Sequence, residues 1–379
     1  MDRAQSEIVG TPRGELERVA AASLGLPSAV VDKKPTCQEL STVHYDPRTI
    51  GIFRVTGTLR EPSGREGAEW SAVAKVIDQS IKGPEGWVSP DQEVLSYTQG
   101  GFSDDGLNFR SAHCLHVSQR EPLLTILWLE DLTSVAKPPF DVSQLSIMAR
   151  HLGEWNGFHA RHRRPFPFEL RANAHAKRWR QSGFKKYLER FGALHDSPYA
   201  RAAFGGLPRA VAYDLHEAGS ALNAKVTTLD RSLAFGDCNV GNLFHTASHT
   251  VAVDWASLAQ DPIGVDAGCM IGSAITFGAR GSEIVAEEQQ LFASYLHGIE
   301  SSGMVYQPTQ VRAAYLCLFA VYLFYSAMMP VLLQVPGEFF SREFYERRYR
   351  TKWEDIPRVV HGVVQALPRY VEEMRQLAR

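Results

Sequence analysis

The chain has 379 residues, and its 40 Lys and Arg nearly balance its 42 Asp and Glu, for a formal net charge of −2. This balance argues against a protein that coats nucleic acid, because such proteins need a basic surface. At about 150 residues per domain, the length predicts two or three folding units. Hydrophobic residues make up 44% of the chain, which is enough to bury large cores and excludes wholesale disorder.

Cysteine usage and the N-terminal sequence bear on the cellular compartment. The first eighteen residues, MDRAQSEIVGTPRGELER, are polar and charged and lack the apolar core of a signal peptide. The cysteines are odd in number and form no Cys-x-x-Cys pair, so neither a disulfide framework nor a zinc ribbon is indicated. We therefore expect a cytoplasmic protein. The five cysteines are Cys37, Cys114, Cys238, Cys269 and Cys317.

The first third of the chain alternates between β-rich segments and turns. A short amphipathic helix is predicted near residues 15–24. Behind it, three β-rich stretches separated by turn-forming residues predict an antiparallel meander, and two further apolar runs complete a sheet of about five strands. A helix with Ser89 as its N-cap follows the third strand. The predicted strands are 39–43, 52–59, 70–77, 112–117 and 123–129.

Beyond residue 139 the hydrophobic periodicity is mostly helical, and one β-rich island at 232–254 interrupts it. We therefore expect an α+β fold with two unequal lobes. The small lobe, 1–129, has an antiparallel sheet plus a helix; 130–139 form a hinge, and the larger lobe, 140–379, is mainly helical. The predicted helical stretches are 142–162, 174–194, 207–226, 282–302, 308–335, 339–352 and 354–378.

One apolar segment, 313–335, carries no charge over 23 positions and is long enough to span a bilayer. Pro330, Ser326, three tyrosines and the lack of a second such segment favour a helix buried on all sides within a large helical domain. We therefore expect no membrane association. A membrane-associated enzyme is kept as an alternative interpretation of this segment.

Three polar side chains stand out in the β-rich island. Asn242 follows Asp237 by five positions, and Asp254 ends the next strand. This pattern places two carboxylates and one amide at the same end of a hairpin. Such hard oxygen ligands suit Mg²⁺ that bridges nucleotide phosphates, with one carboxylate left to orient a hydroxyl. Taken singly, each residue could instead be an ordinary loop or strand-end cap.

With its flanking residues, the island resembles the aminoglycoside phosphotransferase and choline kinase family, a branch of the protein-kinase-like fold. The family pattern is His-Gly-Asp, four residues, Asn, and later Ile-Asp-Trp or Ile-Asp-Phe. Gly236-Asp237, Asn242 and Val253-Asp254-Trp255 match it. The following stretch, 260–266, resembles a family segment whose last residue, here Asp266, braces the catalytic loop.

The N-terminal half holds further segments similar to this family, in the family's order. Lys75, within Val73-Ala74-Lys75-Val76, resembles the lysine that contacts the α- and β-phosphates, and Glu93 stands where its partner carboxylate is expected. Residues 127–132 resemble the hinge whose backbone meets the adenine edge. This implies nucleotide-binding roles for Trp128, Leu129, Glu130 and Leu132. Residues 152–159 resemble the helix that packs under the catalytic loop.

The resemblance implies a bilobal protein-kinase-like fold and an ATP-dependent O-phosphotransferase that acts on a small-molecule hydroxyl. Asp237 would orient the hydroxyl, Asn242 and Asp254 would hold Mg²⁺, and Lys75, fixed by Glu93, would contact the nucleotide phosphates. The acceptor class would be a sugar, nucleoside, amino alcohol or antibiotic, with no nucleic-acid partner. No sequence feature names the acceptor or the oligomeric state.

Two departures from the family pattern motivate a second hypothesis. Phe235 stands where the family has a bracing His, and we expect it to pack instead. The glycine-rich loop is also poor, since residues 44–51 contain one glycine, and a side chain such as Arg48 or Thr49 is expected to assist phosphate binding. Both features fit a pseudoenzyme that binds nucleotide and acts as a sensor or partner-binding protein.

Other sites are less well supported. The spacing of Gly236 and Gly241 is that of a P-loop, but Asn242 replaces its lysine. The pairs His159/His162 and His245/His249 lack a second cluster at zinc-ligand spacing. Residues 161–190 contain ten basic and two acidic residues, which is either a solvated helical face or a field that favours neutral or anionic ligands over polycations.

Overall fold

The computed structural model divides into two compact units, 1–105 with 111–135, and 106–110 with 136–379. The division at 135/136 falls within the segment interpreted as a hinge. The inclusion of 106–110 in the second unit was not foreseen from the sequence. The structure describes residues 3–41, 46–60, 66–81, 91–100, 102, 106–121, 123–163, 165–166, 168–181, 184–276, 280–332 and 342–379.

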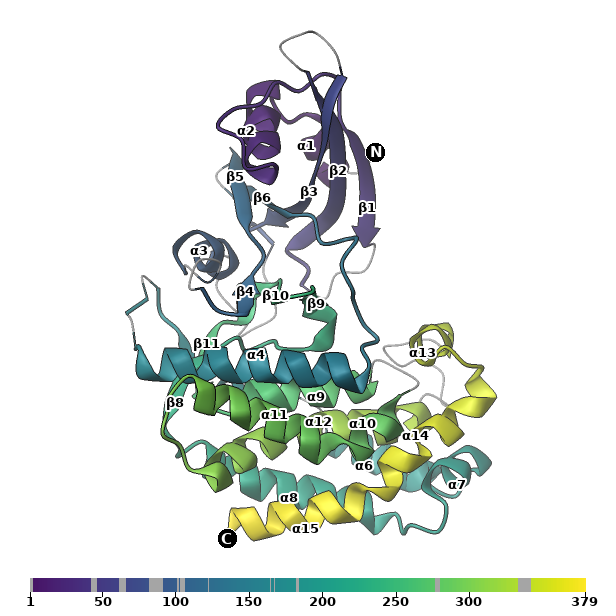
Figure 1. Ribbon diagram of the computed structural model, residues 1–379. Helices are drawn as coiled ribbons and strands as arrows, with labels where there is room; N and C mark the ends of the chain where they lie inside the picture. The colour runs from purple at the N-terminus through teal and green to yellow at the C-terminus, as the bar shows by residue number, and fades with distance from the viewer. Residues whose placement is uncertain are drawn as a thin grey trace. The chain divides into compact units, whose positions relative to one another are not determined.

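The N-terminal unit contains a five-stranded antiparallel sheet in the order β1-β2-β3-β6-β5. Its long central strands pair over most of their length, and β6 lies between β3 and β5 (Figure 1). Each predicted strand is found within a few residues of its expected position. The strands are β1 (Thr36–Ser41), β2 (Thr49–Arg60), β3 (Glu66–Asp78), β5 (Cys114–Glu121) and β6 (Leu124–Glu130).

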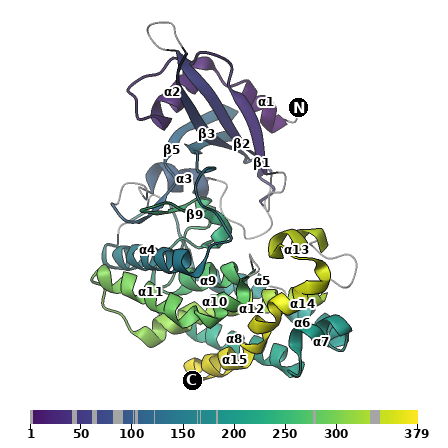
Figure 2. The same ribbon diagram turned by 45° about the vertical axis from the view of Figure 1, so that its right-hand side comes forward.

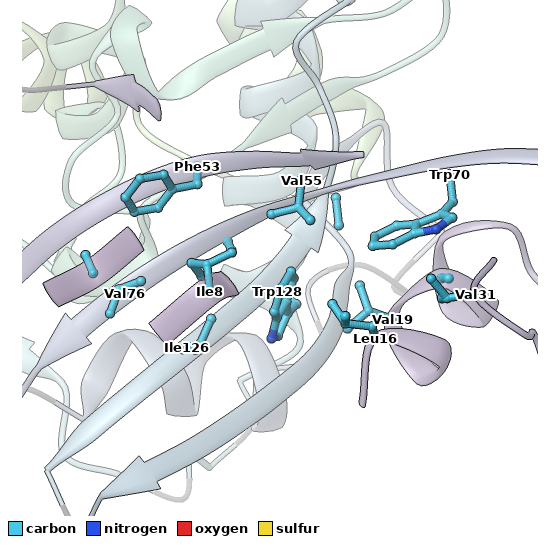
Figure 3. Close-up of a cluster of buried hydrophobic side chains, with 14 of the residues drawn as sticks. Ile8, Leu16, Val19, Val31, Phe53, Val55, Trp70, Val76, Ile126 and Trp128 are labelled. Atoms are coloured by element: carbon cyan, nitrogen blue, oxygen red, sulfur yellow. The ribbon is translucent and has the colours of Figure 1, made fainter. Parts of the chain in front are cut away.

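Two helices, α1 (Arg3–Val9) and α2 (Arg13–Ser23), cover one face of this sheet. Burial alternates along most of β2, as expected for a strand with one covered face. Phe53 and Val55 of β2 therefore meet Ile8 of α1 and Val19 of α2 in the core shown in Figure 3. Helix α2 was predicted from its spacing, whereas the shorter α1 was not.

Helix α3 (Gln92–Gln99) follows β3 and carries Glu93 in its first turn. Asp91 is its N-cap residue, without a side-chain capping hydrogen bond. The predicted cap, Ser89, lies outside the described residues.

The C-terminal unit is mainly helical, and several predicted stretches are divided. Residues 174–194 form α5 and α6, 282–302 form α10 and α11, and 354–378 form α14 and α15 after a short 3₁₀ turn. The helices are α4 (Val142–Arg161), α5 (Ala174–Gln181), α6 (Phe184–Leu194), α7 (Pro198–Phe204), α8 (Ala210–Val226), α9 (Val265–Thr276), α10 (Gly281–Ala286), α11 (Glu288–Ser301), α12 (Pro308–Leu332), α13 (Arg342–Tyr349), α14 (Ile356–Gln365) and α15 (Leu367–Ala378).

Helix α4 begins with a capping box in which Asp141 and Gln144 exchange backbone and side-chain hydrogen bonds. It packs closely against α11. A Cβ atom at Gly153 of α4 would lie 2.0 Å from the carbonyl oxygen of Tyr295, so only glycine permits this approach. The close contact brings Asn156 of α4 and Tyr295 of α11 into hydrogen-bonding range.

Helix α12 is long and apolar enough to cross a membrane by length and composition. In the structure, 83% of its most apolar window, within Pro308–Met328, is buried inside the protein. It packs against α9, whose residues are all buried. This burial is what a core helix of the unit requires, in agreement with the interpretation of 313–335 as a buried helix. Residues 333–335 of that stretch lie outside the described part.

The β-rich island and three segments outside it form short strands in two small sheets. One three-stranded sheet has the order β7-β11-β8. Another has the order β4-β10-β9, and its strands are labelled in Figure 1. The fold class is therefore α+β, as predicted, with the antiparallel sheet in the N-terminal unit and the helices mainly in the C-terminal unit. The short strands are β4 (Phe109–Ser111), β7 (Arg171–Ala172), β8 (Arg231–Ala234), β9 (Leu243–His245), β10 (Thr250–Ala252) and β11 (Ala259–Pro262).

Candidate active site

Asn242 and Asp254 lie at the same end of the β9–β10 hairpin. Leu243 pairs with Ala252 at this end of the ladder. One residue further out, the amide of Val253 donates to the carbonyl of Asn242 at 2.9 Å. Asn242 and Asp254 therefore lie at one end of the hairpin, as expected from the sequence.

Asp237 lies in the segment 235–242 that joins β8 to β9, which we call the Asp237 loop. The side-chain amide of Asn242 donates to Asp237 Oδ2 at 3.0 Å and to its carbonyl oxygen at 3.1 Å. Two of the three residues selected from the island are thus in direct contact. The amide fixes the orientation of the Asp237 carboxylate.

Arg178 of α5 contacts the other oxygen of this carboxylate. Its Nη2 lies 2.6 Å from Asp237 Oδ1, and the two side chains are 26% and 29% exposed. Burial alone would lower the pKa of Arg178, but the adjacent Asp237 carboxylate outweighs it and the pKa is raised. Arg178 was not among the predicted site residues. The only signal for it was the basic segment 161–190.

Asp266 braces the Asp237 loop, as the resemblance implied. Its carboxylate accepts hydrogen bonds from the amides of Phe235 at 2.8 Å and Gly236 at 3.0 Å. Asn156 of α4 also donates to it at 3.2 Å, and the Tyr295 hydroxyl donates to Asn156 at 2.9 Å. Burial raises the pKa of Asp266, and the three hydrogen bonds oppose that shift. The sequence did not single out Asn156 or Tyr295.

Gly236 allows the backbone to turn immediately before Asp237. Its φ is +82°, a conformation that side chains with a Cβ rarely adopt. A Cβ atom here would lie 2.0 Å from the carbonyl oxygen of Ser257. The glycine is therefore required both by the backbone angle and by the lack of space.

Phe235 packs in a buried aromatic cluster, as expected of an aromatic residue at this position. Its ring centroid lies 4.6 Å from that of Trp255 and 6.2 Å from that of Phe109. Trp155 of α4 completes the cluster, 5.8 Å from Trp255. All four rings are buried. The strand that leads into the Asp237 loop is thus held by apolar packing.

The chemistry of Asn242 and Asp254 fits Mg²⁺. Both supply hard oxygen atoms, and Mg²⁺ is usually held by one or two carboxylates together with phosphates and water. Asp254 has a left-handed backbone with φ of +64°, the kind of strained conformation found at functional sites. Among the described residues, no group of three or more His, Cys, Asp or Glu forms a metal cage. Asn242 and Asp254 would supply two oxygen donors to such an ion, with phosphate oxygens and water as the others.

Cys238 follows Asp237 but is not a reactive thiol. Its side chain is buried, and burial raises its pKa well above the usual range. Burial likewise raises the pKa of Cys269, which contacts Arg178, to about 12. Neither cysteine is poised as a nucleophile.

Lys75 and Glu93 form a buried ion pair in the N-terminal unit. Lys75 Nζ lies 2.8 Å and 2.7 Å from the two carboxylate oxygens of Glu93. The residues are 8% and 5% exposed. Strand β3 and helix α3 therefore bring together the two residues paired from sequence, and their contact with nucleotide stays a prediction.

The predicted hinge begins inside the sheet. Trp128 pairs with Ala74 of β3 on one side and His116 of β5 on the other. Its side chain is fully buried and donates to Ser118 Oγ at 2.8 Å. Trp128 therefore has a structural place in the core. The roles of Leu129, Glu130 and Leu132 toward a nucleotide stay predictions.

Of the two residues expected to assist phosphate binding, Arg48 is already engaged. It is buried, and its guanidinium donates to the Asp46 carboxylate, with Nη2 at 2.6 Å. Burial raises the pKa of Asp46, but hydrogen bonds from Arg48 outweigh this effect and lower it. Residues 44 and 45 of the glycine-poor loop lie outside the described residues.

A cavity of about 430 Å³ lies away from these residues in the C-terminal unit. It is lined by His159 and His162 of α4, by residues 227–233 and by Gln260. The cavity is at the start of β8, whereas Asp237 follows the end of that strand. It is therefore separate from the candidate active site.

No family model and no curated protein matches the chain. Among solved structures, a choline/ethanolamine kinase family protein from Mesorhizobium loti is 12% identical, with 90% of this chain and 92% of that chain covered and a TM-score of 0.44. Choline kinase LicA from Streptococcus pneumoniae is 12% identical over 87% and 93%, with a TM-score of 0.45.

Spectinomycin phosphotransferase APH(9)-Ia, solved with ADP and spectinomycin, is 12% identical over 88% of this chain and 94% of that chain, with a TM-score of 0.48. These structural neighbours are choline kinases and antibiotic phosphotransferases, the class of protein that the motifs resemble. At this identity the likeness concerns the fold alone. What the chain does is therefore inferred from its own side chains.

Proposed function

We propose that the protein is an ATP- and Mg²⁺-dependent O-phosphotransferase that phosphorylates a hydroxyl group of a small molecule. One observation carries this proposal: Asn242 orients the Asp237 carboxylate within a loop that Asp266 braces. A partly exposed carboxylate fixed in this way suits the positioning of an acceptor hydroxyl. The acceptor class is a sugar, nucleoside, amino alcohol or antibiotic.

Residues of each unit have a role in this reaction. In the C-terminal unit, Asp237 orients the hydroxyl and accepts its proton, while Asn242 and Asp254 hold the metal ion. In the N-terminal unit, Lys75 binds the nucleotide phosphates and Glu93 fixes its ammonium. Bound Mg²⁺ supplies neutralisation of the phosphate charge.

The reaction joins the acceptor oxygen to the γ-phosphorus and breaks the bond from that phosphorus to the bridging oxygen of ADP. The hydroxyl proton passes to the Asp237 carboxylate. Phosphoryl transfer needs little covalent chemistry from the protein, so alignment and charge neutralisation carry most of the acceleration. The fixed geometry of the Asp237 loop is suited to that task.

The test is transfer of the γ-phosphoryl group to a panel of hydroxyl-bearing metabolites and antibiotics. We expect Asp237→Asn to lower kcat by at least about a thousandfold, because the general base is lost while the shape is kept. Nucleotide affinity should stay within about threefold, since the amide removes no phosphate contact. Asp196→Asn, at a side chain that is 96% exposed, is the matched control. Undiminished transfer by Asp237→Asn would contradict the assignment.

A pseudoenzyme is the second candidate, and one contact favours it. Arg178 occupies Asp237 Oδ1, an oxygen that a reacting hydroxyl would need. A thermal-shift titration with ATP and Mg²⁺, followed by a turnover assay, separates the two functions. A pseudoenzyme is stabilised by nucleotide but transfers no phosphoryl group to any acceptor.

A further inference from the structure

Arg178 of α5 contacts both the Asp237 loop and α9 in the C-terminal unit. Its Nη2 lies 2.6 Å from Asp237 of the Asp237 loop, and its Nη1 lies 3.3 Å from Cys269 Sγ of α9. The hydroxyl of Tyr322 on α12 lies 3.2 Å from the same sulfur. Figure 2 shows α5, α9 and α12 beside one another in this unit. The guanidinium is therefore held in place beside the proposed base.

This guanidinium retains the capacity to bind a ligand. It has five N–H donors, and its hydrogen bonds to the described residues use one donor on Nη1 and one on Nη2. Its side chain is about a quarter exposed, so the residue is not fully enclosed by the protein. Among the described residues, Asp237 is the only carboxylate that contacts it.

We propose that the acceptor carries an anionic group, a carboxylate or a phosphate monoester, beside the hydroxyl to be phosphorylated, and that Arg178 binds this group. The proposal rests on the function proposed above. Because Arg178 touches the carboxylate that receives the hydroxyl, the anion belongs within about three bonds of that hydroxyl. A planar guanidinium recognises the paired oxygens of either anion.

The same arginine disfavours cationic acceptors. A quaternary ammonium or a polyamine bound at Asp237 would lie beside the Arg178 charge, and like charges at this range are repulsive. Helix α5 also carries Lys177 and Arg180 and no acidic residue. Its charge thus adds to the preference. Arg178 belongs to the basic segment 161–190, and its contact with Asp237 connects that segment to the proposed site.

A binding measurement tests the proposal without turnover. The full chain is titrated with inorganic phosphate and, separately, with malonate as a carboxylate probe, by calorimetry and thermal shift. We expect Arg178→Met to weaken binding of at least one probe about tenfold or more, and Arg178→Lys to be intermediate. Which probe responds identifies the anion.

Two further variants sharpen this measurement. Arg180→Met is the matched control, since Arg180 lies on the same helix and is exposed; it removes only a screened surface charge and should weaken probe binding by about twofold or less. Asp237→Asn removes the competing carboxylate and should strengthen anion binding through Arg178. Equal affinity of the unaltered chain and Arg178→Met for both probes would overturn the proposal, provided that both are folded by circular dichroism.

Turnover with matched acceptors gives an independent readout. Glycerol 3-phosphate and glycerate are compared with glycerol, glucuronate with glucose, and choline serves as a cation. Where transfer occurs, we expect kcat/KM for the anionic acceptor to exceed that of its neutral partner about tenfold, and Arg178→Met to remove the difference mainly through KM. An equal fall in kcat for every acceptor would instead place Arg178 on the transferred phosphoryl group and contradict the proposal.

The two proposals fail separately. Anion binding that depends on Arg178, without transfer to any acceptor, contradicts the phosphotransferase and leaves the anion site standing. Transfer that is restricted to neutral or cationic acceptors contradicts the anion site and leaves the phosphotransferase standing.

Discussion

Lys75 places its ammonium within 2.8 Å of both carboxylate oxygens of Glu93, 18 residues later in the chain. Both groups are nearly inaccessible to water. Removal of one partner would leave the other as a buried charge without its counterion, which is more costly than removal of both. The pair is therefore expected to couple stability to nucleotide binding.

Lys75→Met should lower the free energy of unfolding by about 3 kcal/mol, because Glu93 stays buried without its ammonium. The double variant Lys75→Met/Glu93→Leu should recover part of this loss. Both should lose nucleotide affinity. Urea unfolding and nucleotide titration measure the two effects. Equal stability of the single and double variants would show that the ion pair is not the cause.

Gly236→Ala should abolish catalysis and destabilise the protein by about 2–4 kcal/mol, because the residue combines a positive φ with a carbonyl 2.0 Å from the new Cβ. Gly206→Ala is the control, since nothing lies within 4 Å of a Cβ there. Thermal unfolding and single-turnover transfer provide the readouts. A Gly236→Ala variant as stable and active as Gly206→Ala would refute this requirement.

Arg312→Met should destabilise the C-terminal unit by about 3–5 kcal/mol. Arg312 of α12 contacts Glu288, which is fully buried on α11, and donates to Glu373 of α15 at 2.7 Å. The substitution therefore leaves a buried carboxylate unpaired. Arg358→Ala breaks an ion pair whose arginine is 84% exposed, and chemical denaturation should detect about 0.5 kcal/mol or less. Similar losses in both variants would count against the buried network.

His151 should make stability fall on acidification. Burial, with help from Arg150, His245 and His249, lowers the pKa of His151 from 6.5 to about 4. The unfolded chain therefore binds a proton near pH 6.5, while the folded chain resists it until about pH 4. Stability is retained above pH 6.5 and lost as the pH falls toward 4, by on the order of 3 kcal/mol.

His151→Gln should flatten this part of the stability profile, measured by urea unfolding between pH 7 and pH 4.5. His297→Gln, at a side chain that is 68% exposed, should leave the profile unchanged. A profile for His151→Gln that is parallel to that of the unaltered chain would exclude His151 as the source.

The sequence was most informative where residues interact locally. Asp237 and Asn242 are five residues apart, and β9–β10 pairing brings Asn242 level with Val253, so short-range spacing was enough to place these groups together. The strands of the N-terminal sheet show the same advantage. From Phe53 onward in β2, Phe53, Val55 and Leu59 are buried and alternate with less buried polar residues, so burial there follows the hydrophobic pattern.

Contacts between distant segments were not predictable in this way. Arg178 lies 59 residues before Asp237, and nothing near either residue encodes their meeting. Helix α9 was missed because all its residues are buried, so it lacks the polar face that makes a helix periodic in sequence. Short α7 was missed as well, although Ser197 caps it and Pro198 begins it.

Because Phe235 replaces a histidine of the family pattern, different perturbations would displace the Asp237 loop. The phenyl ring of Phe235 has no ionisable proton. Its contacts with Trp255 and Phe109 therefore do not respond to acid or base as the contacts of an imidazole would. They depend instead on filled volume, and a smaller side chain at any ring of the cluster leaves a void. Cavity-forming substitutions, heat and hydrostatic pressure are therefore the perturbations to which the alignment of this carboxylate is most exposed.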